Sequence, residues 1–217
     1  METVLDREQK ETLKAEPEAT NDSKGCQCCT IFTPDRKIKR GYETLKIDVH
    51  AHILPEVIPN FREQFGYGQF VSLKKTDKKG ISHMWQGDKF FREVDDKSWS
   101  CEARLVDMDS DNVQVQVLST VPVMFSYWAK PHDTLRVAQF LNDDIANRCK
   151  QYPTRFVGLG TLPMQSIPLA IQELRRCILE LGLVGIQIGS HIEKWNLDDE
   201  IFFPLWKEGN KKTTFAK

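Results

Sequence analysis

The sequence predicts an α/β fold built on a parallel β-sheet. Four short runs rich in Val, Ile, Leu and Gly recur along the chain, and amphipathic stretches of helical length separate them. Parallel strands need a crossover of a dozen or more residues, so this alternation indicates βαβ units rather than hairpins. The 217 residues are 40% hydrophobic, which is enough apolar content for a sizeable core.

The four expected strands differ in their patterns. The first is a continuous apolar-rich run, and the second alternates Val with Gln before it becomes apolar. The last two are short, contain Gly, and end in small or turn residues. We expect these strands at residues 45–54, 112–121, 155–163 and 183–190.

Three stretches predict the connecting helices, at residues 102–112, 133–152 and 166–182. Asp133 is of the N-cap type and is expected to open the second of these helices. Ser166 is expected to open the third, which Gly182 should end.

The composition changes once, near residue 45. Residues 1–44 are rich in Glu, Lys, Asp and Thr with few aromatics, which predicts a disordered extension. Its cluster of Cys26, Cys28 and Cys29 could hold a soft metal. Because no second Cys/His pair lies nearby, the preferred interpretation is an unstructured tail with exposed thiols. We expect a folded part over residues 45–208, with a small antiparallel insertion at 55–100, and a divergent tail at 209–217.

The charge balance and the terminal sequence exclude several classes of protein. The net charge of −1 favours neither nucleic acid nor a membrane surface. No apolar run approaches the roughly 20 residues that span a bilayer. The N-terminus is charged and lacks an apolar signal region, and the cysteines are expected to be free thiols. These features predict a soluble intracellular protein.

A histidine pair at the end of the first strand is the main candidate site. Residues i and i+2 of a strand point to the same side, so His50 and His52 should present two imidazoles together. Two imidazoles are half of a metal site, and ligands of parallel sheets lie at the carboxyl ends of the strands. The alternative is a pair of ordinary, hydrogen-bonded histidines. If a metal is held, Asp48 is a candidate for a further ligand, which we call the reserve ligand.

Arg92 is a second candidate, because it directly follows Phe90 and Phe91 in the insertion. Its planar guanidinium could hold a carboxylate through two hydrogen bonds, or it could be an ordinary strand arginine with a solvated head. His191 follows the fourth strand and is a candidate for ligand or substrate contact, whereas His83 and His132 are expected to be solvated.

Several long motifs carry a family resemblance. "KIDVHAHILPE", "FREQFGYGQFVSL", "VQVLSTVPVMFSYWAKPHDTL" and "RFVGLGTLPMQSIPLAIQEL" resemble metal-dependent decarboxylases of the amidohydrolase superfamily, from about Leu45 to about Trp206. The resemblance implies a (β/α)8 TIM barrel, a catalytic zinc, a homodimer and a cytosolic enzyme. It also implies that the enzyme removes a carboxylate as CO2 from a small-molecule substrate in the kynurenine branch of tryptophan breakdown. This reaction would limit quinolinate and NAD formation.

The same resemblance assigns roles to individual residues. His50 and His52 match the family's first two zinc ligands, and Arg92 matches its arginine for a substrate carboxylate. His191 matches a position other than the third ligand. The later histidines, the aspartate ligand and an interface arginine have no counterpart, so no catalytic residue is expected within this chain.

We therefore expect the N-terminal half of a barrel, about four βα units, as a truncated isoform or a gene-model fragment. An alternative is an inactive chain that serves as an interaction or regulatory partner of a full-length subunit.

Overall fold

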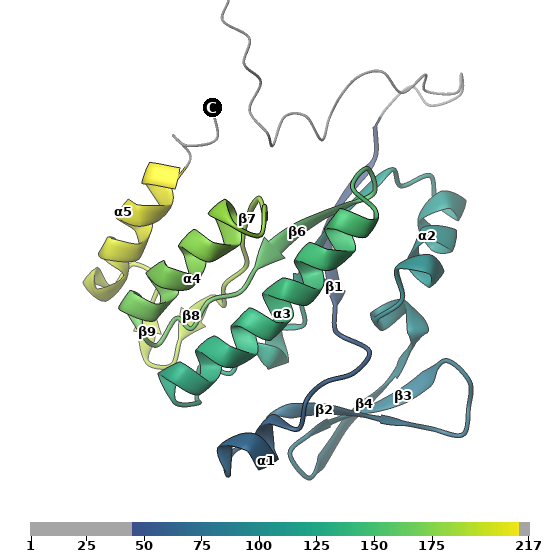
Figure 1. Cartoon of the computed structure of the whole chain (residues 1–217), viewed down its shortest axis with the longest axis horizontal. Coiled ribbons are helices and arrows are strands. Elements are labelled where there is room, and N and C mark those ends of the chain that lie inside the picture. Colours follow the sequence, from purple (N-terminus) through teal and green to yellow (C-terminus); the bar gives the residue numbers. More distant parts are fainter. Residues whose placement is uncertain (1–44, 213–217) are drawn as a thin grey trace, which may run out of the picture.

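The computed structural model describes residues 45–212. The expectations for residues 1–44, with their cysteine cluster, and for residues 213–217 lie outside the described residues. Four parallel strands form the central sheet in the order β1-β5-β6-β7 (Figure 1). They are β1 (Ile47–Ile53), β5 (Val115–Thr120), β6 (Phe156–Gly160) and β7 (Gly185–Ile186). The predicted α/β class with a parallel sheet is confirmed.

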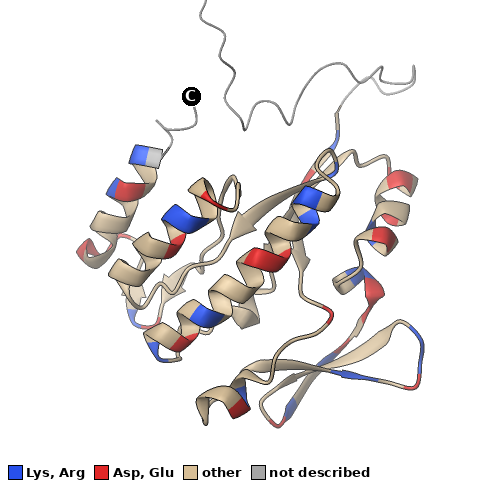
Figure 2. Cartoon of the chain, in the orientation of Figure 1, with Lys and Arg blue, Asp and Glu red and all other residues tan. Residues whose placement is uncertain are grey.

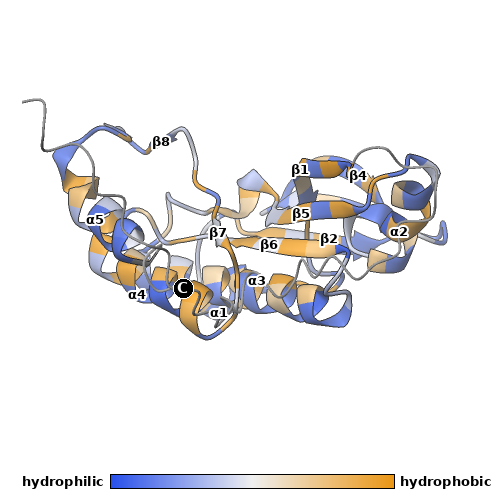
Figure 3. Cartoon of the chain, turned by 90° about the horizontal axis from the view of Figure 1, so that it is seen from above, coloured by the Kyte–Doolittle hydropathy of each residue, from blue (hydrophilic) through white to orange (hydrophobic). Residues whose placement is uncertain are grey.

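Helices connect these strands and cover one face of the sheet (Figure 3). The apolar cluster between the layers takes Ile53, Leu118 and Phe156 from three strands and packs them against residues of the helices. A second cluster joins α4 and α5. The helices are α2 (Cys101–Ser110), α3 (Pro131–Gln151), α4 (Ile167–Leu179) and α5 (Phe203–Lys212). Along α3 and α4, basic and acidic residues are interspersed (Figure 2).

The insertion after β1 folds as a small antiparallel sheet, as predicted. Its strands are β2 (Val71–Lys75), β3 (Ile81–Gln86) and β4 (Lys89–Asp95), and α1 (Phe61–Phe65) precedes them. Residues of this sheet share an apolar cluster with Val121 and Met124, which follow β5, and with Leu141 of α3. This packing holds the insertion beside the carboxyl ends of β1 and β5 (Figure 1).

Two further short strands, β8 (His191–Ile192) and β9 (Trp195–Asn196), form a separate hairpin after β7. Short 3-10 turns lie at Asp96–Ser98, Pro122–Met124 and Glu200–Phe202. The last helix, α5, runs to Lys212, so residues 209–212 continue the helix that begins at Phe203.

One predicted helix start is wrong. The helix α3 begins at Pro131, with Lys130 at the N-cap, so Asp133 lies in the first turn instead of opening the helix. Proline suits this position because its φ is fixed and it has no N–H to satisfy. The Asp133 carboxylate instead accepts a hydrogen bond from the Tyr67 hydroxyl, at 2.8 Å. Ser166 is the N-cap of α4, as predicted.

The fourth strand is shorter than its apolar run suggests. Only Gly185 and Ile186 pair with β6, and β7 stands at the end of the sheet order. Backbone hydrogen bonds from Val184 and Gln187 to β6 flank this pairing. An apolar run predicts that a segment is buried, but the number of residues that pair in the sheet depends on the neighbouring strand, here β6.

Among the described residues, β1 also pairs on one side only. Ile47 and Val49 of this strand are 42% and 72% exposed. Within residues 45–212, β1 is therefore an open strand edge that carries exposed apolar side chains.

A buried polar network joins α3, α4 and the end of β6. Asn142 of α3 accepts a hydrogen bond from the Thr161 backbone N–H at 2.7 Å, and its amide group donates to the Thr161 carbonyl at 2.9 Å. The same amide donates to Glu173 of α4 at 2.7 Å, and Arg176 pairs with Glu173. The Asn142 amide, the Glu173 carboxylate and the Thr161 backbone groups are thus each hydrogen-bonded, which buried polar groups require.

Other described features agree with the sequence analysis. Cys101, Cys149 and Cys177 are free thiols. Burial raises the pKa of the Cys149 thiol to about 12. Within residues 45–212, no helix combines the length and the apolar composition that a membrane crossing requires.

Candidate functional site

A β-bulge in β1 shapes the candidate metal site. Asp48 pairs with Gln116 of β5, but the next paired residue is Ala51, opposite Leu118. Three steps along β1 therefore match two along β5, so β1 carries one extra residue. Without the bulge, Asp48 would share a face with both histidines, because strand side chains alternate.

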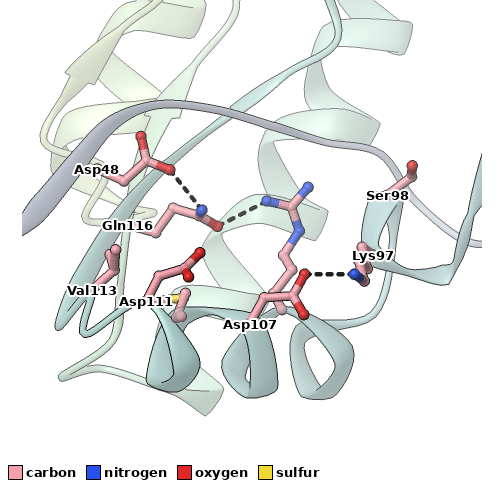
Figure 4. Close-up of a pocket in the computed structure, with 9 residues that line it drawn as sticks. Asp48, Lys97, Ser98, Asp107, Asp111, Val113 and Gln116 are labelled. Atoms are coloured by element: carbon pink, nitrogen blue, oxygen red, sulfur yellow. Dashed lines mark hydrogen bonds and ion pairs between the residues drawn. The ribbon is translucent and has the colours of Figure 1, made fainter.

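The extra residue turns Asp48 toward helix α2. One Asp48 carboxylate oxygen accepts from the Gln116 amide at 2.8 Å, and the other accepts from the His50 backbone N–H at 3.1 Å. The Gln116 carbonyl in turn accepts from Arg104 of α2 at 2.8 Å (Figure 4). These groups line a polar cavity of about 350 Å³ beside α2. Asp48, the reserve ligand of the sequence analysis, is thus engaged on the helix side of β1.

Arg104 also steadies the backbone of the histidine pair, because its guanidinium donates a hydrogen bond to the His52 carbonyl. The arginine is largely buried, and desolvation lowers its pKa. The bulge is therefore held from both sides: Asp48 binds the backbone N–H of His50, and Arg104 binds the backbone carbonyl of His52.

The structure brings the two predicted histidines together. The ring centroids of His50 and His52 lie 5.0 Å apart with the planes at 80°. His50 is exposed and His52 is partly buried. Burial lowers the pKa of His52, and the charges of His50, Arg104 and Arg92 lower it further, whereas the Thr120 backbone acts in the opposite direction. The lowered pKa favours the neutral form of His52, which is the form that binds a metal.

Ser119 of β5 contacts the ring of His52. Its hydroxyl oxygen lies 3.1 Å from His52 Nδ1 and donates to the Ala51 carbonyl at 3.2 Å. Outer groups of this kind commonly orient metal-ligating histidines. Sequence reasoning missed this residue; the available signal was the hydroxyl pair "ST" that closes the alternating run of the second strand.

Arg92 lies on β4, opposite Met84 of β3. Its side chain is exposed, and its guanidinium carbon lies 5.6 Å from the centre of the Phe91 ring. Its positive charge is the smallest of the contributions that lower the pKa of His52.

The donor set fits part of a divalent metal site. Two adjacent imidazoles suit zinc or a related ion, and catalytic zinc sites commonly have three protein ligands with one open position. Across the described range, no group of three or more His, Cys, Asp or Glu side chains converges on one point. Among the described residues, His50 and His52 therefore offer two of the ligands that such a site needs.

The other histidines lie apart from this pair. His191 belongs to the β8–β9 hairpin, is exposed, and lies 3.2 Å from the Ser190 hydroxyl through Nδ1. It lines a separate cavity of about 700 Å³ with Tyr127 and Gln187. His83 pairs with Glu93 at 3.4 Å across β3 and β4, and His132 is exposed in the first turn of α3.

Comparisons with known proteins agree with this geometry. The family described as Amidohydrolase matches residues 47–210. The 2-amino-3-carboxymuconate-6-semialdehyde decarboxylase of Dictyostelium discoideum is 54% identical over 168 residues, covering 77% of this chain and 46% of that protein. The protein of that name from Caenorhabditis elegans is 44% identical over 182 residues, covering 75% and 45%. The chain thus spans about half the length of these curated relatives.

Solved structures show the same fold. A 5-carboxyvanillate decarboxylase from Novosphingobium aromaticivorans, complexed with manganese, superposes with a TM-score of 0.60 at 22% identity. The match covers 81% of this chain and 49% of that protein. The expected resemblance to decarboxylases and to half of an amidohydrolase barrel is confirmed.

Proposed function

Because the chain belongs to the amidohydrolase family, we propose that it contributes to a metal-dependent, non-oxidative decarboxylation of 2-amino-3-carboxymuconate 6-semialdehyde. The two curated relatives that carry this name support the substrate, with 54% and 44% identity. The single observation that carries the proposal is the pair of adjacent imidazoles, His50 and His52, with ring centroids 5.0 Å apart in β1 of a chain that matches the family over residues 47–210.

His50 and His52 would hold the metal, which we propose to be zinc. When bound, such an ion acts as a Lewis acid and lowers the pKa of a bound water. Arg92 would hold a substrate carboxylate by two parallel hydrogen bonds, a geometry that lysine cannot copy. Asp48 and Arg104 would keep the two imidazoles at their separation by fixing the bulge.

The wider setting belongs to the same proposal. We assign the reaction to the kynurenine branch of tryptophan breakdown, where it would limit quinolinate and NAD formation. A cytosolic location and a homodimeric assembly are also proposed, and both derive from the family resemblance.

A chimera tests this function. Residues 45–208 of this chain would replace the matching half of the Dictyostelium decarboxylase, whose 54% identity makes the exchange conservative. We expect the chimera to release CO2 from the substrate in a metal-dependent manner. His50→Ala should lose both metal and activity, because it removes a ligand. Arg92→Lys should lower turnover and leave the metal content unchanged.

His132→Ala is the matched control, since His132 is exposed on α3. A folded chimera that keeps full activity after both His50→Ala and Arg92→Lys would refute the assignment. For the 217-residue chain alone we expect weak zinc retention after dialysis and no measurable decarboxylation, because two imidazoles are a small ligand set. Stoichiometric, tightly held zinc would contradict this expectation.

A second candidate function is that of a non-catalytic partner of a full-length subunit. The open apolar edge at β1 favours it, because unpaired strand edges are sites for pairing with another chain. We expect a co-eluting complex with altered activity when the chain is mixed with a full-length decarboxylase. Separate elution at all ratios would exclude this role.

A further inference from the structure

We propose that Ser119 is a positioning residue that fixes His52 as the tautomer with a proton on Nδ1 and a free lone pair on Nε2. His52 would then offer Nε2, and not Nδ1, to a divalent metal. The metal part of this inference rests on the proposed function, whereas the tautomer itself is a property of the described chain.

The two side chains are held opposite each other by the sheet. In the parallel pairing of β1 with β5, His52 is the register partner of Ser119, and Ala51 is the partner of Leu118. Ser119 is 4% exposed, so water is largely excluded from its hydroxyl. Its oxygen lies 3.1 Å from His52 Nδ1 and 3.2 Å from the Ala51 carbonyl oxygen.

The serine hydroxyl has one proton, and this decides the direction of both contacts. A carbonyl oxygen can only accept, so the bond to Ala51 uses the serine proton. The serine oxygen is then an acceptor toward the ring, and Nδ1 must carry a hydrogen. Both hydrogen bonds are made at once in this arrangement.

The opposite arrangement is poorer. If the serine proton pointed at Nδ1, the ring would carry its hydrogen on Nε2, and the bond to the Ala51 carbonyl would be lost. One hydrogen bond at a buried site corresponds to a several-fold preference.

The consequence concerns metal binding. A neutral imidazole has one lone pair for a metal, and the hydrogen bond of the other nitrogen determines which nitrogen presents it. With Nδ1 engaged by β5, only Nε2 remains for an ion.

Nitrogen-15 NMR of the histidine rings in the intact 217-residue chain, without metal, tests the tautomer. At about pH 8 the ring is neutral, since an unperturbed histidine titrates near 6.5. The His52 signals are identified by their loss in His52→Gln. We expect a protonated Nδ1 and an unprotonated Nε2. A protonated Nε2 in the unsubstituted chain would overturn the proposal, whatever the outcome of the activity tests.

Substitutions then test the role of the hydroxyl. Ser119→Ala should shift His52 toward the Nε2-protonated form and weaken zinc binding in the chimera by roughly 10- to 100-fold. Ser119→Thr keeps a hydroxyl and should keep the tautomer. Ser82→Ala is the matched control, because Ser82 is a strand serine of 5% exposure in β3. An unchanged tautomer in Ser119→Ala would also refute the inference.

The two proposals fail separately. A chimera without activity that shows the expected tautomer refutes the proposed function and leaves the tautomer assignment standing. If Ser119→Ala does not fold, the unsubstituted chain and Ser119→Thr still decide the question, because loss of the Nδ1 proton in the threonine variant would contradict the role of the hydroxyl.

Discussion

Arg176→Met should destabilise the fold far more than a surface ion-pair deletion does. Glu173 has a side chain that is 0% exposed, and Arg176 binds it with two parallel hydrogen bonds of 2.8 and 2.9 Å. Methionine keeps the apolar stem but no donor, so the carboxylate would stay buried with the Asn142 amide at 2.7 Å as its remaining strong donor. Breaking a buried pair in this way costs about 3–5 kcal/mol.

This loss is large beside the roughly 5–15 kcal/mol that separates folded from unfolded domains. With a urea m-value of about 2 kcal/mol/M, the unfolding midpoint should fall by about 2 M. Urea titration followed by circular dichroism measures the shift. Amide hydrogen exchange at Thr161 should quicken as well, because Asn142 connects this backbone to Glu173.

Lys97→Met is the matched control. Lys97 and Asp107 also form a close pair, at 2.7 Å, but their side chains are 51% and 49% exposed. An exposed pair of this kind contributes little to stability, because water and salt screen the two charges. Equal midpoint shifts for the two variants would refute the argument that burial decides the cost. The double substitution Glu173→Leu with Arg176→Met should recover most of the loss, because the uncompensated charge is then gone.

Two further predictions concern the insertion and the sheet edge. Gly68→Ala should destabilise the fold more than Gly66→Ala. Both glycines have a positive φ, +87° for Gly68 and +75° for Gly66, but only a Cβ at Gly68 would meet the Trp128 ring, at 2.5 Å. The control should lose about 1–2 kcal/mol from backbone strain alone, and equal melting temperatures would argue against the Trp128 contact. Val49→Lys should reduce self-association, measured by light scattering, because a charge on an open strand edge opposes pairing. Val106→Lys replaces a valine of nearly equal exposure, 70% against 72%, on a helix, and an equal effect there would count against the edge.

The residue pattern alone predicted the α/β class, the four strands, three of the helices and the small insertion. Period-two and helical apolar patterns indicate which side of a strand or helix is buried, so these elements can be predicted without knowing what packs against them. The adjacency of His50 and His52 was predictable for the same reason, since two residues in one strand share a face. The aromatic neighbours of Arg92 left two alternatives open, a carboxylate-binding residue or an ordinary strand arginine, and the choice between them relied on the family resemblance.

Only the tertiary structure decided the rest of the candidate site. The bulge that separates Asp48 from the histidines depends on the register between β1 and β5, and no residue in "KIDVHAHILP" marks it. The partner of Asp133 in the first turn of α3 is Tyr67, which lies far away in the chain, so the sequence of the helix does not indicate this contact. Ser119 and Arg104 reach His52 from another strand and from a helix. Such contacts join residues about 50 to 70 positions apart, and sequence periodicity describes only neighbours along the chain.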